Sequence, residues 1–300
     1  MNKNIYFAAI DMGSNAVRFV IKSIAKDPSD NSESLSQDLL IRFPLRLGDD
    51  VFMRGKISKS KAKKLQHLMK SFHQMLKIFP IQDFKACATS AMRDSENGDK
   101  IVKKIYKKTG INIEIIAGEE EARIIYETHI ERELGQDADY MYMDVGGGST
   151  QISLIHSGNL VYSHSFNIGT VRMMKNMVNP IEKETFISKL QELRAQYPEL
   201  QLVGSGGNIN KLYKLLQEKK DHDILNVDRM KQLYQELSPL PIETRMKKYR
   251  IKRDRAEVIG FAAGIFIDAA NAMQMDTIVV PSISIADGII NKMFQKYAAE

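Results

Sequence analysis

The sequence has little cysteine and no long hydrophobic run. Only one of its 300 residues is cysteine, so the chain cannot form an internal disulfide. No apolar run reaches the ~18 residues that a membrane-crossing helix needs. Residues 1–4 lead almost at once into an apolar segment, without the apolar core and small-residue cleavage site of a secretion signal. We therefore expect a cytoplasmic protein that does not enter the membrane.

Histidine-based metal sites and thiol chemistry also find little support in the composition. The six histidines show no metal-ligand spacing. The single cysteine, Cys87, lies between Ala86 and Ala88, and no histidine lies close to it in the sequence. A catalytic thiol needs a group that lowers its pKa. We therefore expect Cys87 to be a small buried core residue.

The charge is positive and unevenly distributed. The net charge is +6, which favours anionic partners. One run of basic residues contains a single acid, Asp254; its members are Arg245, Lys247, Lys248, Arg250, Lys252, Arg253 and Arg255. Such a run is commonly a solvated helix face, but here it leads into an apolar helix and also fits a surface that binds a polyanion. No nucleic-acid-binding module or aromatic stacking pattern accompanies it, so specific nucleic-acid binding is the weakest alternative.

Apolar periodicity alternates between strands and helices along the chain, which predicts an α/β protein of two domains. Strands are predicted at 6–10, 16–22, 39–47, 84–89, 111–116, 140–145, 151–155, 200–203 and 277–280. Helices are predicted at 58–78, 99–108, 118–133, 182–196, 209–218, 227–237 and 257–273, with a final helix after Asp287-Gly288. The polar segment 29–36 is predicted to be a loop.

Two glycine turns share one plan and suggest an internal repeat. Asp11 and Asp144 each end an apolar strand, and each is followed by an apolar residue, glycine and an alternating strand. Asp144 lies 133 residues after Asp11, about one domain length. This spacing suggests duplicated halves that face each other.

Each turn also has a chemical use. Glycine lets backbone N–H groups approach an anion closely, and the preceding aspartate can hold Mg²⁺ beside that anion. A tight hairpin turn is the alternative for either turn alone. A third glycine-rich turn at 204–208 makes that alternative less favourable. None of the three fits the P-loop or the dinucleotide-binding spacing.

The segments around these turns resemble the exopolyphosphatase/guanosine pentaphosphate phosphohydrolase (Ppx/GppA) family, within the actin-like ATPase superfamily. The matching segments occur in family order and span most of the chain. They are 9–15 with Arg18, 46–48, 88–93 with Asn97, 115–123, 144–150, Gly169, 204–207 and 255–258.

The resemblance implies two ribonuclease-H-like (actin-like ATPase) domains flanking a central cleft. We expect these domains at 1–127 and 128–300. In an alternative arrangement, the last helix packs back on the first domain. It also implies hydrolysis of phosphoanhydride bonds with Mg²⁺ or another divalent ion.

The resemblance also implies roles for individual residues. Glu121, at the glutamate just before alanine in the family's Gly-x-Glu-Glu-Ala segment, would be the catalytic base, and Glu119 and Glu120 would be helix-start charges. Asp144, with Asp11 second, would hold the metal. The substrate phosphates would be bound by Gly13, Ser14, Asn15, Arg93, Gly146, Gly147, Gly148, Ser149, Thr150, Gly206 and Gly207.

Two positions depart from the family pattern. Gln151 stands where members usually have glutamate, so we expect it to position water or metal in a different way. Related nucleoside-triphosphate apyrases have glutamine after a similar Ser-Thr, so hydrolysis stays compatible with it. The usual Arg-Glu-Gly reads Ala286-Asp287-Gly288, which removes one phosphate contact. Longer members also carry a C-terminal domain that this sequence lacks, and a homodimer could supply such an extended groove.

Three functions follow, from two classes. The first is an exopolyphosphatase that removes terminal phosphate from inorganic polyphosphate. The second is a phosphohydrolase acting on guanosine pentaphosphate or another nucleotide, for which the sequence shows no base-binding pocket. The third is a non-catalytic regulator that binds polyphosphate or nucleotide, which the departure at Gln151 favours.

Overall fold

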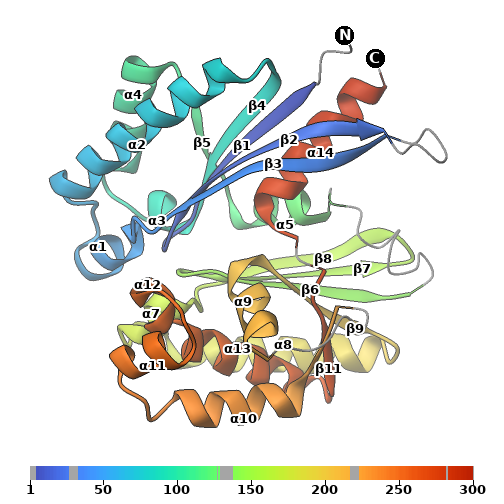
Figure 1. Cartoon of the computed structure of the whole chain (residues 1–300). Helices are drawn as coiled ribbons and strands as arrows, with labels where there is room; N and C mark the ends of the chain where they lie inside the picture. The colour runs from blue at the N-terminus through green and yellow to red at the C-terminus, as the bar shows by residue number, and fades with distance from the viewer. Residues whose placement is uncertain are drawn as a thin grey trace. The chain divides into compact units, whose positions relative to one another are not determined.

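The computed structural model describes residues 5–26, 33–126, 128, 138–216, 223–281 and 283–299 (Figure 1). The chain divides into two compact units. Unit 1 is Met1–Thr128 with Ile285–Glu300, and unit 2 is His129–Ser284. Unit 1 is therefore discontinuous in the sequence, because it takes its last helix from the end of the chain.

Unit 1 is built on a mixed five-stranded sheet in the order β3-β2-β1-β4-β5. Its strands are β1 Tyr6–Met12, β2 Val17–Lys26, β3 Glu33–Phe43, β4 Ile81–Ala88 and β5 Ile113–Ile115. Its helices are α1 Leu47–Arg54, α2 Lys59–Ile78, α3 Ser90–Arg93, α4 Gly98–Thr109, α5 Gly118–Tyr126 and α14 Ile285–Ala298. The first three strands form an antiparallel meander, and β4 and β5 then run parallel to β1.

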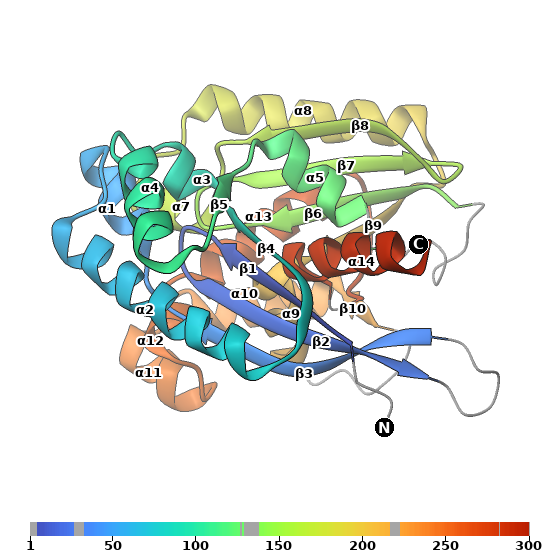
Figure 2. The ribbon, with the colours of Figure 1, turned by 90° about the horizontal axis from the view of Figure 1, so that it is seen from above.

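The alternation of side chains along β1 gives this sheet two buried faces. Phe7 and Ala9 belong to one apolar cluster with residues of α14, and the Phe7 ring meets that of Tyr297 edge-on. Ile10 points to the other face with its cross-strand partner Phe19, whose ring stacks on Phe72 of α2. Both faces are therefore covered by helices, and α2 and α4 lie side by side (Figure 2).

Unit 2 is built on a six-stranded sheet in the order β10-β11-β9-β6-β7-β8. Its strands are β6 Tyr140–Val145, β7 Thr150–His156, β8 Asn159–Phe166, β9 Gln201–Ser205, β10 Ile224–Asn226 and β11 Thr277–Val279. Its helices are α7 Thr170–Met174, α8 Pro180–Gln196, α9 Gly206–Leu216, α10 Val227–Leu237, α11 Ile242–Lys248, α12 Arg253–Ala256 and α13 Ile259–Ala272. Its core gathers apolar residues from the sheet and from α8, α9, α10 and α13.

The two sheets repeat one topology. Each sheet has three antiparallel strands, β3-β2-β1 in unit 1 and β8-β7-β6 in unit 2. Two strands parallel to β1 or to β6 follow, and unit 2 adds β10 at the edge. The register also repeats, because Asp11 lies opposite Arg18 and Asp144 lies opposite Gln151. This agreement supports the internal repeat that the two glycine turns suggest.

Most predicted elements agree with the structure, but the strand β8 and several short elements were not predicted, and several boundaries differ. Residues 34–36 belong to β3 and not to a loop, because they pair with β2 beyond the point where their polar composition predicts an end. Leu47 begins α1 and does not end a strand. The last helix begins at Ile285, before Asp287-Gly288. The predicted continuations of the helices at 118–133 and 209–218 fall mainly outside the described residues.

The prediction for Cys87 is confirmed. Its side chain is fully buried in β4, and burial raises the pKa of the thiol to about 12. The thiol therefore stays protonated near neutral pH, which suits a core residue and not a nucleophile.

Candidate active site

The turn after β1 is held by one bond within the turn and by bonds from two other segments of unit 1. The Gly13 amide donates to the Ala16 carbonyl at 3.0 Å, which closes the turn. The Ser14 hydroxyl lies 2.8 Å from the Ser90 hydroxyl at the start of α3. The Gly48 amide donates to the Ser14 carbonyl at 2.8 Å. Backbone and hydroxyl groups of this turn are thus fixed before any ligand binds.

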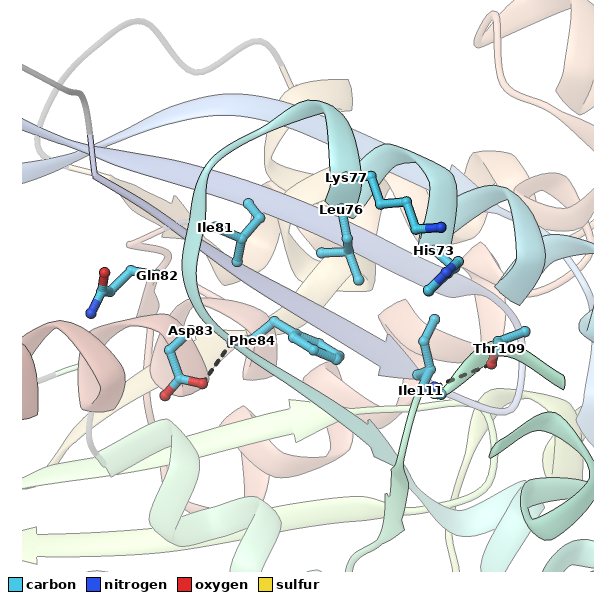
Figure 3. Close-up of a pocket in the computed structure, with 10 residues that line it drawn as sticks. His73, Leu76, Lys77, Ile81, Gln82, Asp83, Phe84, Thr109 and Ile111 are labelled. Carbon is cyan, nitrogen blue, oxygen red and sulfur yellow. Dashed lines mark hydrogen bonds between the residues drawn. The ribbon is translucent and has the colours of Figure 1, made fainter. Parts of the chain in front are cut away.

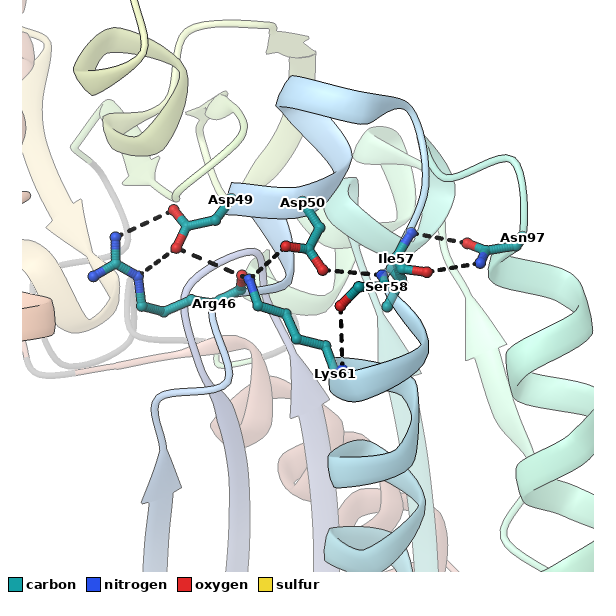
Figure 4. Close-up of polar contacts among 7 residues, drawn as sticks. All are labelled: Arg46, Asp49, Asp50, Ile57, Ser58, Lys61 and Asn97. Carbon is teal, nitrogen blue, oxygen red and sulfur yellow. Dashed lines mark hydrogen bonds and ion pairs between the residues drawn. The ribbon is translucent and has the colours of Figure 1, made fainter.

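A polar network buttresses the segment that touches this turn (Figure 4). Arg46, in the left-handed region with φ 56°, donates to Asp49 from Nε at 2.7 Å, and its amide donates to the Asn15 carbonyl at 2.9 Å. Burial works against the charge of Asp50, but hydrogen bonds from Ser58 and Lys61 outweigh it and lower the pKa of Asp50. The matched segment 46–48 therefore supports the turn and does not form part of its exposed surface.

Asp11 ends β1 in a buried position. One carboxylate oxygen, Oδ2, lies 3.7 Å from the Arg18 guanidinium, and Oδ1 is buried with no hydrogen-bond partner. Burial raises the pKa of Asp11, the Arg18 charge opposes that change, and the nearby Asp287 adds to it. A buried carboxylate without full compensation is a position where a cation would be stabilised.

Glu121 lies in the first turns of α5 with its side chain only 5% exposed. The Arg93 guanidinium, at the end of α3, donates from Nη1 to Glu121 Oε1 at 2.9 Å and to the Ile116 carbonyl at 2.8 Å. An arginine at this distance stabilises a carboxylate in its ionised form. The structure therefore brings Arg93 and Glu121 together, although 28 residues separate them in the sequence.

The glycine turn of unit 2 is enclosed by α7. The amide of Gly146 donates to the Ser149 carbonyl at 2.9 Å. The turn's carbonyls then accept from α7, and these bonds are Thr170 N to Gly146 O, Val171 N to Gly147 O and Arg172 Nε to Gly148 O. A side chain at Gly169 would meet the Gly147 carbonyl oxygen at 2.4 Å. The turn's carbonyls are therefore occupied on this side, and the Gly146 amide is used within the turn itself.

The third glycine turn lies beside Asp144. Gly206 has φ 84°, a conformation that favours glycine, and a Cβ there would lie 2.6 Å from Asp144 Oδ1. Two residues later, the Asn208 amide group donates to the Val145 carbonyl at 2.7 Å and accepts from Arg255 Nη1 at 2.6 Å. Gly206 therefore lies against the carboxylate of Asp144, and Asn208 links this turn to the end of β6 and to α12.

The structure places Gln151 directly across β6–β7 from Asp144. Its amide nitrogen donates to the Ser149 hydroxyl at 3.0 Å and to the Ser165 hydroxyl at 3.4 Å. A glutamate at this position could not donate either bond. The departure from the family pattern therefore has a structural partner set of its own, and the hydroxyl of Ser149 is part of it.

Several cations of the run 245–255 bind within unit 2. Arg245 donates to the carbonyls of Leu240, Ala256 and Ser238, which joins the end of α10 to α11 and α12. Lys248 pairs with Glu236, Arg253 with Glu243, and Arg255 with Asn208. Lys247, Arg250 and Lys252 are exposed. The polyanion surface stays a prediction, and Arg245 contributes to it least because its guanidinium caps carbonyls.

Two site residues were missed by the sequence reasoning. Arg172 and Asn208 hold the two turns of unit 2 from the flanking helices. Neither has a local signal, because each acts through a carbonyl far away in the sequence. Their proximity to the matched segments at Gly169 and 204–207 is the only available pointer.

The residues present fit a divalent ion that phosphate would help to bind. Among the described residues, no group of three or more His, Cys, Asp or Glu side chains gathers as a metal cage. Mg²⁺ commonly uses one or two carboxylates together with water and substrate phosphates. Asp11 has a buried oxygen without a hydrogen-bond partner, and only a residue without a side chain, Gly206, fits against the carboxylate of Asp144. We propose each of these carboxylates as a ligand of that kind.

A pocket of about 490 Å³ lies elsewhere in unit 1 (Figure 3). It is lined by the end of α2, the start of β4 and residues 109–111, including His73, Lys77 and Phe84. The candidate residues of unit 1 follow the other end of β4, so none of them lines this pocket.

In the described part of the chain, no helix is long and apolar enough to span a membrane.

Two α/β units of repeated topology, each with a glycine turn after its first strand, define the actin-like ATPase fold, and comparison with solved structures agrees. A family member from Aquifex aeolicus matches with a TM-score of 0.77 at 24% identity, over 98% of this chain and 99% of that one. An exopolyphosphatase from Cytophaga hutchinsonii matches with a TM-score of 0.83 at 20% identity, over 97% and 98%.

The chain belongs to the Ppx/GppA phosphatase family, whose model matches residues 34–297. A bifunctional 3-dehydroquinate synthase/phosphatase of Fusobacterium nucleatum is 30% identical over 57% of this chain. A guanosine-5'-triphosphate,3'-diphosphate pyrophosphatase of Photobacterium profundum is 22% identical over 97% of it. The chain spans 26% and 59% of the lengths of these two relatives. The predicted family and fold are thereby confirmed.

Proposed function

We propose that this chain is an exopolyphosphatase that hydrolyses terminal phosphoanhydride bonds of inorganic polyphosphate and releases phosphate. The observation that carries the proposal is the buried Glu121 carboxylate, fixed by Arg93 at 2.9 Å in the helix that follows β5. A fixed carboxylate can orient a water molecule and accept its proton as the phosphorus–oxygen bond forms.

The two glycine turns would bind the phosphates in this proposal. Turn amides and the Ser14 and Ser149 hydroxyls would donate to phosphate oxygens, and their fixed positions mean that little reorganisation accompanies the reaction. Arg93 would contact the phosphoryl group that is transferred. Mg²⁺ or another divalent ion, held by Asp144 with Asp11, would neutralise phosphate charge when bound.

The proton balance is simple. Water loses one proton to Glu121 and forms the new bond to the terminal phosphorus. The bridging oxygen leaves with the shortened chain, and the Glu121 proton then returns to solvent or to the released phosphate. Arg93 stabilises Glu121 in the state that accepts the proton, so the pair acts as one unit.

Hydrolysis of guanosine pentaphosphate is the second candidate. The relative named as a guanosine-5'-triphosphate,3'-diphosphate pyrophosphatase matches almost the whole chain, which favours it. The same turns and the same base would serve, because the scissile bond is again a phosphoanhydride.

Replacement of Glu121 tests the proposal. In Glu121→Gln, we expect phosphate release from long-chain polyphosphate with Mg²⁺ to fall by about 10²–10⁴-fold, because the amide cannot accept a proton. Polyphosphate binding should persist. Glu120→Gln is the matched control, since this neighbour is more exposed and its cation is Arg123 at 3.9 Å; it should retain activity.

The substrate panel separates the candidates. Wild-type protein should release phosphate from polyphosphate with a higher kcat/KM than from guanosine pentaphosphate. The opposite order favours the second candidate, and turnover of neither substrate contradicts enzymatic function. Full activity in Glu121→Gln contradicts the assignment of the base.

A further inference from the structure

Two lysines of α9, Lys211 and Lys214, gather with Arg255 of α12 next to the glycine turns of unit 2. Asn208, Lys211 and Lys214 follow at intervals of three residues, a spacing that keeps their side chains on neighbouring parts of one helix face. Arg255 joins this face through its bond to Asn208. Lys211 is half-buried and Lys214 is exposed.

Among the described residues, Lys211 and Lys214 lack the carboxylate partners that accompany other lysines of unit 2. Lys183, Lys189, Lys231 and Lys248 each form an ion pair with an aspartate or glutamate. Among the described residues, no carboxylate lies within ion-pair distance of Lys211 or Lys214. Burial, together with the Arg255 and Lys214 charges, lowers the pKa of Lys211. Positive charges held close together are stabilised by a bound anion.

The position of the cluster indicates what the anion is. Asn208 is bonded to the carbonyl of Val145, the residue just before the Gly146 turn. From Asn208 to Lys214, α9 advances about 9 Å. A ligand that has one phosphate at the turn and further phosphates beyond it would therefore pass along this face.

We infer that Lys211, Lys214 and Arg255 form a subsite for the phosphates of the substrate that lie beyond the terminal ones. This inference rests on the proposed function and specifies its substrate as a chain of phosphates longer than the glycine turns alone accommodate. The cluster differs from the predicted run 245–255, because two of its three members come from α9.

The test compares long-chain polyphosphate with tripolyphosphate. In Lys211→Gln/Lys214→Gln, we expect KM for the long chain to rise about tenfold, with kcat within about twofold of wild type. KM for tripolyphosphate should stay near the wild-type value. The dependence of long-chain KM on salt should also weaken, because two charge contacts are lost. Lys211→Arg/Lys214→Arg should restore both.

Lys231→Gln is the matched control, since it removes an exposed lysine of the same unit that already pairs with Asp228. It should leave both KM values unchanged, and thermal unfolding should show that all variants are folded. A wild-type long-chain KM and salt slope in the double variant would overturn the inference. So would an equal rise of KM for both substrates.

Failure of the proposed function gives a different result. If wild-type protein releases no phosphate from either substrate, the inference is judged by equilibrium binding of long-chain polyphosphate alone. Weaker binding by the double variant than by Lys231→Gln supports the subsite, and equal binding overturns it.

Discussion

Asp11 shows how a site residue is held at a cost to stability. Its carboxylate is buried, one oxygen has no partner, and Arg18 compensates only from 3.7 Å. Burial therefore raises the pKa of Asp11 above 3.8. Buried acidic groups with a raised pKa are common where a ligand later supplies the missing charge.

The sign of its pH dependence follows. Between 3.8 and the raised pKa, the folded protein holds a proton that the unfolded chain has lost, so the free energy of unfolding falls as pH rises through this range. Asp11→Asn removes the penalty. We expect the variant to be more stable than wild type at pH 7 in the absence of metal, and this gain to vanish below pH 3.8.

Urea unfolding in the presence of EDTA, at pH 7 and below pH 3.8, measures the free energy of unfolding of the variant and of wild type. The exposed Asp38 provides the control, and Asp38→Asn should leave stability nearly unchanged. A variant Asp11→Asn that is less stable than wild type at pH 7 would show that the carboxylate is already compensated. Polyphosphate hydrolysis should decrease in the variant, because the proposed metal site would lose one of its carboxylates.

The packing of two helices in unit 1 depends on one glycine. A Cβ at Gly288 of α14 would lie 1.8 Å from the Ile124 carbonyl oxygen of α5, and the two helices are neighbours in Figure 1. Asn291 of α14 also donates to the Thr128 carbonyl at 3.1 Å. Because α5 carries Glu121, the packing of α14 against α5 also helps to position this proposed base.

Gly288→Ala should therefore destabilise the protein by about 3 kcal/mol and reduce phosphate release, because the helices must separate. Gly264→Ala is the matched control. Gly264 also lies inside a helix, but its nearest atoms belong to the Tyr234 ring at 3.7 Å, an ordinary contact. That variant should be unchanged or more stable by up to about 1 kcal/mol. Equal stability of the two variants, measured by thermal unfolding, would contradict the close packing.

Helices with strong local signals were the predictable elements. The helix predicted at 58–78 has apolar residues at helical spacing, and in the structure it begins at Lys59, after Ser58, whose side chain accepts a hydrogen bond from the Lys61 amide. Short helices were missed. The helix α1 has eight residues and follows a left-handed Arg46, and α3 has only four residues, so neither contains enough periodicity to be recognised.

The candidate site divides in the same way. The glycine turns and Glu121 were predicted because family motifs mark them. The pairing of Arg93 with Glu121 and the role of Asn208 depend on contacts across the fold. Such contacts have no counterpart in a single sequence, and only the positions of strands and helices reveal them.

The molecule as a whole is a continuous unit 2 inserted into a discontinuous unit 1. The inserted segment 129–284 contains its own apolar core, whereas the core of unit 1 combines Phe7 and Ala9 with Ile289 and Ile290. A chain that ends at Ser284 should therefore keep unit 2 folded and lose the fold of unit 1, since a fully buried face of β1 becomes exposed.

Limited proteolysis with mass spectrometry measures this outcome, and cleavage should concentrate within residues 1–128. A chain that ends at Tyr297 is the control, because it keeps the ring that contacts Phe7. It should resist cleavage as the whole chain does. Protection of residues 1–128 in the chain that ends at Ser284 would contradict the shared core.

This arrangement also sets the order of events during synthesis. The first strand leaves the ribosome long before the helix that covers Phe7 and Ala9, because β1 ends at Met12 and α14 begins only at Ile285. The segment 129–284 can fold while the chain is still attached to the ribosome, so we expect unit 2 to fold before unit 1. Until then the nascent β1 exposes an apolar face, and we expect chaperone binding to the growing chain to concentrate there.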